Sequence, residues 1–270
     1  MLLRTGDDAA LLAEVSRIAL LAGDAIRRIE LGGSYQVWRK PDASALTQAD
    51  LAANDIIVDA LQALDPQTPV ISEEGRWNID GGVPPRFWLV DPLDGTREFV
   101  AGNGEYTVNI ALVEHGEPTL GVVHVPAHGI TYSAARGTGA SRTDAQGTRT
   151  IHARCEGELV VVVSRSHAGP LLPTFLAALP PHRTVPMGSA LKTCLVADGT
   201  AQLYPRLGPT CWWDTAAAHA IALECGADVM ALDGLPLRYD GVTILNPSFV
   251  CSSVPPDVWL PGARAVEPDV

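Results

Sequence analysis

Lysine is nearly absent from this chain, and its scarcity bears on what the protein can bind. Only Lys40 and Lys192 occur in 270 residues, against 17 arginines, and the 31 acidic side chains bring the formal net charge to −12. Proteins that bind DNA or RNA draw much of their affinity from Lys and Arg that neutralise phosphates. The composition therefore argues against a nucleic-acid partner, and a phosphorylated small molecule would have to be bound by a few local cations.

Paired cysteines and long apolar runs are also lacking. The cysteines are Cys155, Cys194, Cys211, Cys225 and Cys251. This odd set without a C-x-x-C pair fits neither a disulfide framework nor a zinc site, so we expect reduced, mostly buried thiols. The longest apolar runs, such as residues 159–163, are far shorter than the roughly 20 residues that span a bilayer. We expect no integral membrane segment.

The first residues contain no apolar stretch long enough for a signal peptide before Asp7 and Asp8. We therefore expect a cytoplasmic protein, with peripheral attachment at the inner membrane face left open. The sequence leaves both a monomer and a homodimer open.

Hydrophobic periodicity predicts the elements of the first half. Apolar residues at three- and four-residue spacing predict an amphipathic helix over residues 7–31. Thr47 and Asp50 have the spacing of a capping box, which places the start of a second helix near Thr47. The short apolar runs 69–71 and 87–90 lead directly into acidic residues, so we expect buried strands that deliver carboxylates at their ends.

The pattern changes along the second half. Gly and Pro punctuate strand-like segments between residues 107 and 135, which predicts an antiparallel meander. Strands and helices then alternate, as in a layered α/β structure. We expect strands over 159–163 and 201–204, and helices over 171–179, 190–197 and 215–225. We place a boundary near residue 157, between an N-terminal α+β domain over 1–157 and a C-terminal α/β domain over 158–270. The Pro-rich tail after Pro255 is expected to be loosely held.

The strongest local signal is the run W-L-V-D-P-L-D-G-T at residues 88–96. Pro92 fixes one φ angle and Gly95 frees the next step, so Asp91 and Asp94 should converge where the strand ends. Mg²⁺ prefers such carboxylate oxygens together with substrate phosphate. The alternative is an acidic turn whose aspartates bond only to their own backbone.

Two further acidic segments have an equally ordinary alternative. Glu73 and Glu74 follow the preceding strand, where buried carboxylates are costly unless a cation or hydrogen bonds offset them, but a solvated loop would also explain them. Asp214 opens an apolar helix, and Asp is a preferred N-cap residue in any case. No single motif decides between metal binding and these structural roles.

The combination of motifs is more specific than any one of them. Between about Lys40 and Phe249 the chain contains K-P-D at 40–42, L-T-x-A-D at 46–50, S-E-E at 72–74, D-P-L-D-G-T-R-E-F at 91–99, G-S-x-L-K at 188–192, Y-P-R at 204–206 and W-D-T-A-A at 213–217. In this order they resemble the inositol monophosphatase family of lithium-sensitive, Mg²⁺-dependent phosphatases. Within it, the likeness is greatest to the CysQ-type 3′(2′),5′-bisphosphate nucleotidases.

The resemblance implies a layered α-β-α-β-α sandwich with two or three Mg²⁺ ions per active site. The implied metal ligands are Glu73, Asp91, Asp94, Asp214 and the carbonyl of Leu93. The implied catalytic residues are Asp50, Thr96 and Glu73, with Thr96, held by Asp50, orienting the attacking water. The expected substrate contacts are Glu73, Leu93, Asp94, Gly95, Thr96, Ser166, His167, Gly188, Ser189, Lys192, Arg206 and Asp214.

The last of these segments suit a substrate with a second phosphate. Ser166 and His167 follow a buried strand, and Gly188 and Ser189 precede a helix whose N-terminus can bind an anion. Lys192 lies near the start of that helix, and Arg206 follows a further strand. The implied reaction is hydrolysis of the 3′-phosphate of adenosine 3′,5′-bisphosphate, or of its sulfated relative, to remove a by-product of sulfate assimilation. Two cations about 3.5 to 4 Å apart would serve such a hydrolysis without a phosphoenzyme.

Three alternatives remain. Another phosphatase of the same family would act on inositol phosphates or other sugar phosphates. A haloacid-dehalogenase-like enzyme would need its second Asp two residues after the first, whereas Asp94 follows Asp91 by three. A non-catalytic metal-binding partner protein is the third, because family membership does not guarantee activity.

Overall fold

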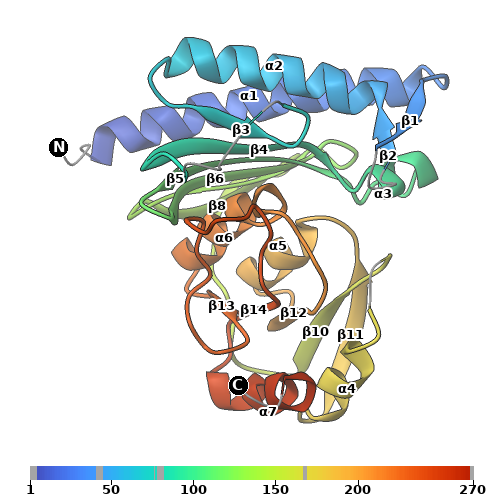
Figure 1. Ribbon diagram of the computed structural model, residues 1–270, viewed down its shortest axis with the longest axis vertical. Helices are drawn as coiled ribbons and strands as arrows, with labels where there is room; N and C mark the ends of the chain where they lie inside the picture. Colours follow the sequence, from blue (N-terminus) through green and yellow to red (C-terminus); the bar gives the residue numbers. More distant parts are fainter. Residues whose placement is uncertain (1–4, 41–44, 76, 78–81, 167–168, 268–270) are drawn as a thin grey trace.

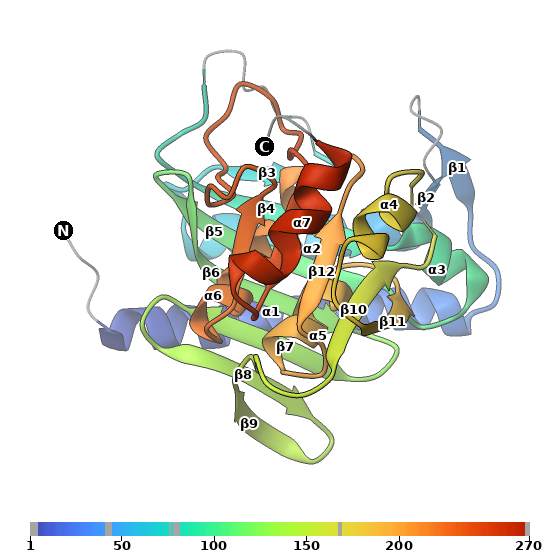
Figure 2. The same ribbon diagram turned by 90° about the horizontal axis from the view of Figure 1, so that it is seen from below.

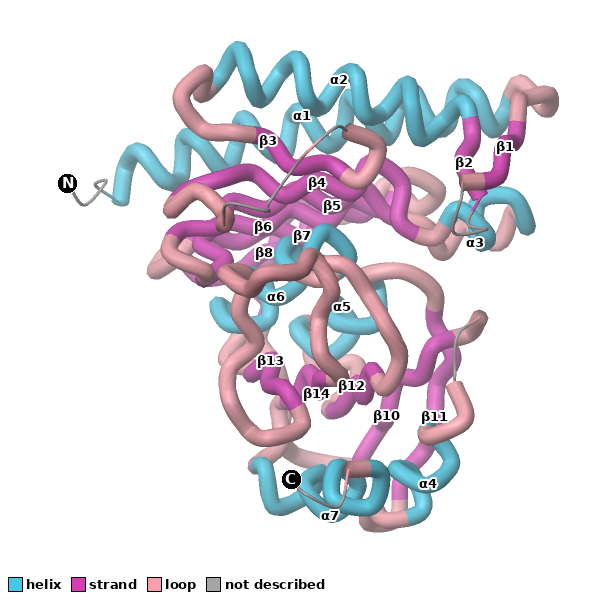
Figure 3. The backbone as a smooth tube through the Cα atoms, viewed as in Figure 1, coloured by secondary structure: helices cyan, strands magenta, loops and turns pink. Residues whose placement is uncertain are grey.

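The computed structural model describes residues 5–40, 45–75, 77, 82–166 and 169–267. Figure 1 shows five layers: the helix pair α1 and α2, a seven-stranded sheet, the helices α5 and α6, a five-stranded sheet, and the helices α4 and α7. This order confirms the expected α-β-α-β-α sandwich. Figure 3 separates the helices from the strands in the same view.

The outer helix pair forms where the periodicity predicts it. Helix α1 spans Thr5–Leu31 and α2 spans Gln48–Leu64. Thr47 and Asp50 form the expected capping box, with the Thr47 side chain accepting from the backbone and Asp50 accepting from the Thr47 backbone. The apolar faces of both helices pack on one face of the first sheet, where residues such as Ile18, Ile57 and Trp88 are fully buried. This packing fixes Asp50 above the end of a central strand.

The first sheet is a meander that keeps the order of the sequence. Its strands are β3 (Val70–Ser72), β4 (Arg86–Asp94), β5 (Thr107–Glu114), β6 (Glu117–Val125), β7 (Ile130–Ala135), β8 (Gly139–Asp144) and β9 (Gly147–Ile151). Strands β3 and β4 are parallel and the remaining pairs are antiparallel. The β4–β5 register shifts between Asp91 and Asp94, so the paired strand gives way to the turn that carries both acids.

The second half contains a mixed sheet in the order β11-β10-β12-β14-β13. These strands are β10 (Leu159–Ser164), β11 (His182–Met187), β12 (Leu203–Arg206), β13 (Asp228–Ala231) and β14 (Phe249–Ser252). The helices are α4 (Leu172–Ala177), α5 (Leu191–Ala197), α6 (Ala216–Glu224) and α7 (Pro256–Val266), with a 3₁₀ turn at Trp212–Asp214. Near the site, β1 (Val37–Arg39) pairs with β2 (Ala45–Thr47), and α3 (Thr96–Ala101) follows β4. Among the described helices, none is both long enough and apolar enough to cross a membrane.

The expectation of a loosely held tail after Pro255 is wrong. Helix α7 begins at Pro256 and lies across the five-stranded sheet, as Figure 2 shows. Trp259 and Ala263 on this helix are 1% and 0% exposed, because they pack with Phe175 of α4 and Val161 of β10. Proline suits the first turn of a helix, so a Pro-rich start did not prevent one here.

The division of the chain near residue 157 stays a prediction. The first sheet ends at Ile151 and the second begins at Leu159. The largest hydrophobic cluster, however, includes Phe87 and Val123 from the first sheet together with Val162 and Phe249 from the second. One continuous core thus joins the two sheets through α5 and α6.

Candidate active site

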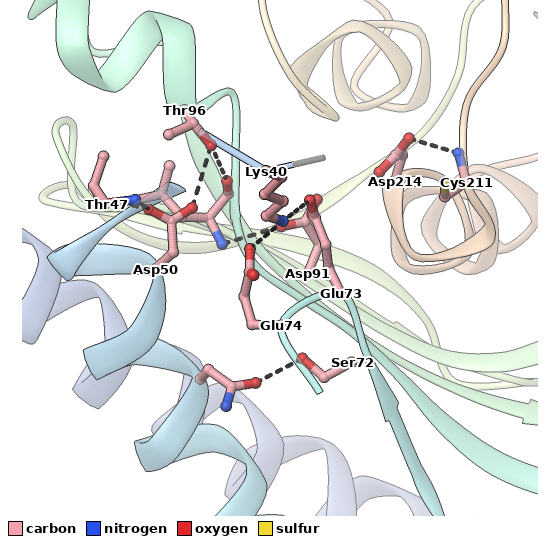
Figure 4. Close-up of polar contacts among 12 residues, drawn as sticks. Lys40, Thr47, Asp50, Ser72, Glu73, Glu74, Asp91, Thr96, Cys211 and Asp214 are labelled. Carbon is pink, nitrogen blue, oxygen red and sulfur yellow. Dashed lines mark hydrogen bonds and ion pairs between the residues drawn. The ribbon is translucent and has the colours of Figure 1, made fainter. Parts of the chain in front are cut away.

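Three carboxylates meet between the two sheets. Glu73, Asp91 and Asp214 each place one oxygen within 4.8 Å of an oxygen of the other two. Glu73 follows β3, where its N–H donates to the Val90 carbonyl at 3.0 Å. Asp91 lies in β4 and is 2% exposed. The predicted strand ends and the 3₁₀ turn therefore bring three of the four proposed metal-binding acids together (Figure 4).

The local backbone bonds that offered an alternative explanation are also present. Asp91 Oδ1 accepts from the Leu93 N–H at 3.1 Å, and Asp214 Oδ2 accepts from the Cys211 N–H at 2.7 Å. Asp214 does not open a helix as expected: it ends the 3₁₀ turn, and α6 begins at Ala216. Each of these bonds uses one carboxylate oxygen, so a second oxygen on each side chain is left for a cation.

The electrostatics of this cluster favour a bound cation. Burial raises the pKa of Asp91 well above its usual range, and the nearby charges of Glu73, Asp94 and Asp214 raise it further. Burial and the charges of Asp94 and Glu73 raise the pKa of Asp214 to about 8. Converging carboxylates that disfavour their own ionisation suit a hard divalent cation with oxygen ligands. The donor set therefore fits the metal that the family resemblance implies.

A lysine contacts the same cluster, although we predicted no role for it beyond its place in the K-P-D motif. Lys40 Nζ lies 2.6 Å from Glu73 Oε1 and 2.6 Å from Glu74 Oε1. Burial alone would lower the Lys40 pKa, but the two carboxylates outweigh it and raise the pKa above its usual value. Mainly because of burial, the pKa of Glu74 rises to about 7. The signal was available, since this is one of two lysines in the chain.

Asp94 lies at the same cavity but is held by different partners. Its Oδ2 accepts from Asn109 Nδ2 at 3.4 Å, and the backbone amide of Ala190 faces the carboxylate and lowers its pKa. Burial is the largest influence on its pKa, which rises to about 6 although the Lys192 charge lowers it. We expected the start of α5, after Gly188 and Ser189, to bind a substrate anion. The Ala190 amide, which directly precedes α5, instead faces the Asp94 carboxylate.

Asp50 and Thr96 form a hydrogen-bonded pair behind the cluster (Figure 4). Asp50 Oδ2 accepts from the Thr47 N–H at 2.7 Å and from Thr47 Oγ1 at 2.5 Å. Thr96 Oγ1 lies 3.2 Å from Asp50 Oδ1 and 3.3 Å from the Leu93 carbonyl oxygen. Asp50 is 2% exposed, and burial is the main reason why its pKa is raised. The hydroxyl is therefore fixed between a buried carboxylate and the turn that carries the acids.

Most of the predicted site residues surround one cavity of about 460 Å³, whereas Asp50, Lys40 and Glu74 do not line it. The predicted site residues that line it are Glu73, Asp91, Leu93, Asp94, Gly95, Thr96, Gly188, Ser189, Lys192, Arg206 and Asp214. Ser166 does not line it but donates to Glu98 Oε1 at 2.6 Å, and His167 lies outside the described residues. Glu98, Tyr204 and Thr210 also line the cavity and were not predicted.

The two cations that line the cavity differ in their surroundings. Lys192 is 7% exposed, its ammonium lies 5.5 Å from the centre of the Tyr204 ring, and it donates to the Ser189 carbonyl. Burial lowers its pKa to about 8. Arg206 Nη2 donates to the Pro209 carbonyl at 2.8 Å. A ligand phosphate beside them would meet two positive side chains.

Comparison with known proteins identifies the family. Residues 10–265 match the inositol monophosphatase family. The chain belongs to this family. It is 47% identical to the 3′(2′),5′-bisphosphate nucleotidase CysQ of Escherichia coli over 88% of the chain and 98% of that relative, and 39% identical to the CysQ of Buchnera aphidicola over 90% and 94%. The family resemblance drawn from the motifs is confirmed.

Solved structures give the same result. A crystal structure of CysQ from Bacteroides thetaiotaomicron superposes with a TM-score of 0.81 at 36% identity, covering 92% of this chain and 98% of that one. The inositol monophosphatase of Thermotoga maritima superposes with a TM-score of 0.77 at 25% identity, covering 93% and 96%. The layered fold is therefore that of the family.

Proposed function

We propose that this protein hydrolyses the 3′-phosphate of adenosine 3′,5′-bisphosphate, and of its sulfated relative, to release phosphate. The observation that carries the proposal is a single cavity that is lined both by the carboxylate cluster and by the cations Lys192 and Arg206. The name of the relatives at 47% identity supports this substrate class. The place of action is the cytoplasm, and the cofactor is Mg²⁺.

The acidic side chains indicate where the reacting phosphate would bind. Glu73, Asp91, Asp94, Asp214 and the Leu93 carbonyl would hold the metal ions. A divalent cation supplies charge neutralisation for the phosphoryl group and lowers the pKa of a water molecule. Because Glu73, Asp91 and Asp214 converge in the cavity wall, the scissile phosphate belongs beside them.

Thr96 and Asp50 handle the proton of the attacking water. The Thr96 hydroxyl donates its proton in a hydrogen bond to Asp50. The lone pairs of the Thr96 oxygen can therefore accept a proton from the water. As the water oxygen forms its bond to phosphorus, Thr96 takes a proton from the water and passes its own to Asp50. The bond between phosphorus and the ribose 3′-oxygen breaks, the departing oxygen takes a proton from solvent water to become the 3′-hydroxyl, and no bond forms between the protein and the phosphate. The raised pKa of Asp50 suits it to receive this proton.

Lys192 and Arg206 would bind the second phosphate and so favour a bisphosphorylated nucleotide. Ser166, His167, Gly188, Ser189 and Gly95 are proposed to complete the substrate contacts. Ser166 would act from behind Glu98, because its hydroxyl donates to that side chain. Inositol monophosphatase activity is the second candidate, since the Thermotoga maritima enzyme of that name has the same fold.

The test is product analysis. Incubation with adenosine 3′,5′-bisphosphate and Mg²⁺ should yield AMP with its phosphate on the 5′ position, and chelation of the metal should stop the reaction. Release of the 5′-phosphate instead, or turnover that continues at full rate in chelator, would contradict the proposal.

A further inference from the structure

Glu105 contacts Gly188 in the cavity wall but belongs to neither the carboxylate cluster nor the substrate contacts proposed above. It precedes β5, and its side chain is 15% exposed. Arg165, which follows β10, donates from Nε to Glu105 Oε2 at 2.8 Å and from Nη2 to Oε1 at 2.5 Å. An ion pair of this kind at a surface contributes little to stability and alone would imply nothing about function.

A third bond distinguishes this carboxylate from a surface ion pair. The backbone N–H of Gly188 donates to Glu105 Oε2 at 2.7 Å. The two segments of the chain are also in close contact. A Cβ added at Gly188 would lie 2.8 Å from the Glu105 carbonyl oxygen and 2.8 Å from Cγ of Glu98. Glu105 therefore joins a loop of the first half to the turn that follows β11 in the second half.

That turn has an unfavourable backbone conformation. Ser189 has φ 46°, in the left-handed region that non-glycine residues rarely adopt. Such a residue persists only where the surroundings determine its conformation. Here Glu105 binds the residue before it, while Lys192 donates to the Ser189 carbonyl.

The turn ends at an amide that faces one of the proposed metal ligands. The Ala190 N–H is directed at the Asp94 carboxylate, and a Cβ added at the neighbouring Gly95 would lie 3.4 Å from the Ser189 Cβ, so the turn packs against the segment that carries Asp94. Mutation of groups that orient metal ligands from outside the coordination sphere costs about 10- to 100-fold in metal affinity or activity. A shift of the Gly188–Ser189 turn would move this amide and the Lys192 contact together.

We propose that Glu105 is a positioning residue, which holds the Gly188–Ser189 turn so that the Ala190 amide stays on Asp94. It acts through the turn and does not touch the reacting atoms. The inference rests on the proposed function for its kinetic consequence, while its consequence for metal binding needs no substrate.

The test compares Glu105→Ala with Glu105→Gln and a control. Glutamine keeps an oxygen that can accept from Gly188, and alanine does not. Glu117→Ala is the matched control. Like Glu105, Glu117 accepts two hydrogen bonds from arginine, here from Arg136 at 2.8 Å and from Arg238 at 3.4 Å. Unlike Glu105, it is 56% exposed and has no contact with the described residues of the cavity wall. We expect Mg²⁺ binding, titrated calorimetrically without substrate, to weaken about tenfold in Glu105→Ala. We also expect kcat to fall by about tenfold or more with a smaller change in KM, while Glu105→Gln recovers most of both and the control matches the wild type.

A merely structural role predicts a lower melting temperature with wild-type Mg²⁺ affinity and kcat within twofold of the control, and that result would overturn the inference. Glu105→Asp decides the question if the alanine variant does not fold, since it keeps the charge but shortens the side chain, and wild-type Mg²⁺ affinity in it would equally contradict the proposal. Failure of the wild type to release phosphate from any ester would refute the proposed function, and the Mg²⁺ titration would still test Glu105.

Discussion

Replacing Thr96 with valine removes the hydroxyl of the proposed proton relay and keeps the shape of the side chain. The hydroxyl oxygen lies 3.2 Å from Asp50 Oδ1 and 3.3 Å from the Leu93 carbonyl oxygen. Asp50 keeps both of its bonds from Thr47 in the variant. Loss of one hydrogen bond of this type lowers the free energy of unfolding by about 1 kcal/mol. The variant should therefore remain folded.

The effect on catalysis should be much larger than the effect on stability. A positioned general base contributes about 10²- to 10⁴-fold to rate, so we expect kcat to fall by a factor in this range. The bond is needed mainly in the transition state, which is why KM should change little. Steady-state phosphate release over a range of substrate concentrations measures both constants.

Thr68→Val is the matched control for this substitution. Thr68 is 6% exposed, and its hydroxyl donates to Asp65 Oδ2 at 2.7 Å, outside the cavity. It should lose a similar amount of stability and keep its kcat. If Thr96→Val kept wild-type kcat, or changed only KM, Thr96 would belong to substrate binding and the relay would be wrong.

Three further outcomes follow from the site. Asp94→Asn should remove most phosphate release at saturating Mg²⁺ without unfolding the protein, and near-wild-type turnover would show that Asp94 is not a ligand. The pKa of Asp94 is raised to about 6 and that of Asp214 to about 8, whereas an Asp in the unfolded chain has a pKa of roughly 3.9. From about pH 4 to pH 8 the folded state therefore binds more protons than the unfolded state. The melting temperature of the metal-free protein should therefore fall from pH 5 to pH 8, and a rise would contradict these shifts. Lys192→Ala and Arg206→Ala should raise KM for adenosine 3′,5′-bisphosphate more than for inositol 1-phosphate, and equal losses would remove them from the second-phosphate site.

Those parts of the site that depend on local sequence could be predicted. The Thr47–Asp50 capping box is set by residues three apart, and the acids of β3 and β4 follow apolar runs directly. Such patterns report strand ends and helix starts without knowledge of the rest of the chain. The layered order of the elements followed from the same reasoning together with the family resemblance.

The parts that depend on distant contacts were not predicted. Glu105 meets Arg165 and Gly188 only because the two sheets pack through one core, and neither partner lies near it in the sequence. Strands β1, β2, β8, β9, β11, β13 and β14 were also missed. Of these, β1 and β9 are mostly exposed, and exposed strands lack the apolar alternation that marks a half-buried strand.

The most direct test of the account is phosphate release by the wild-type protein from four substrates at equal Mg²⁺ concentration: adenosine 3′,5′-bisphosphate, its sulfated relative, inositol 1-phosphate and fructose 1,6-bisphosphate. If the acids hold the reacting phosphate while Lys192 and Arg206 bind the second one, kcat/KM should be highest for adenosine 3′,5′-bisphosphate. A higher kcat/KM for inositol 1-phosphate, which has no second phosphate, would contradict the nucleotidase assignment.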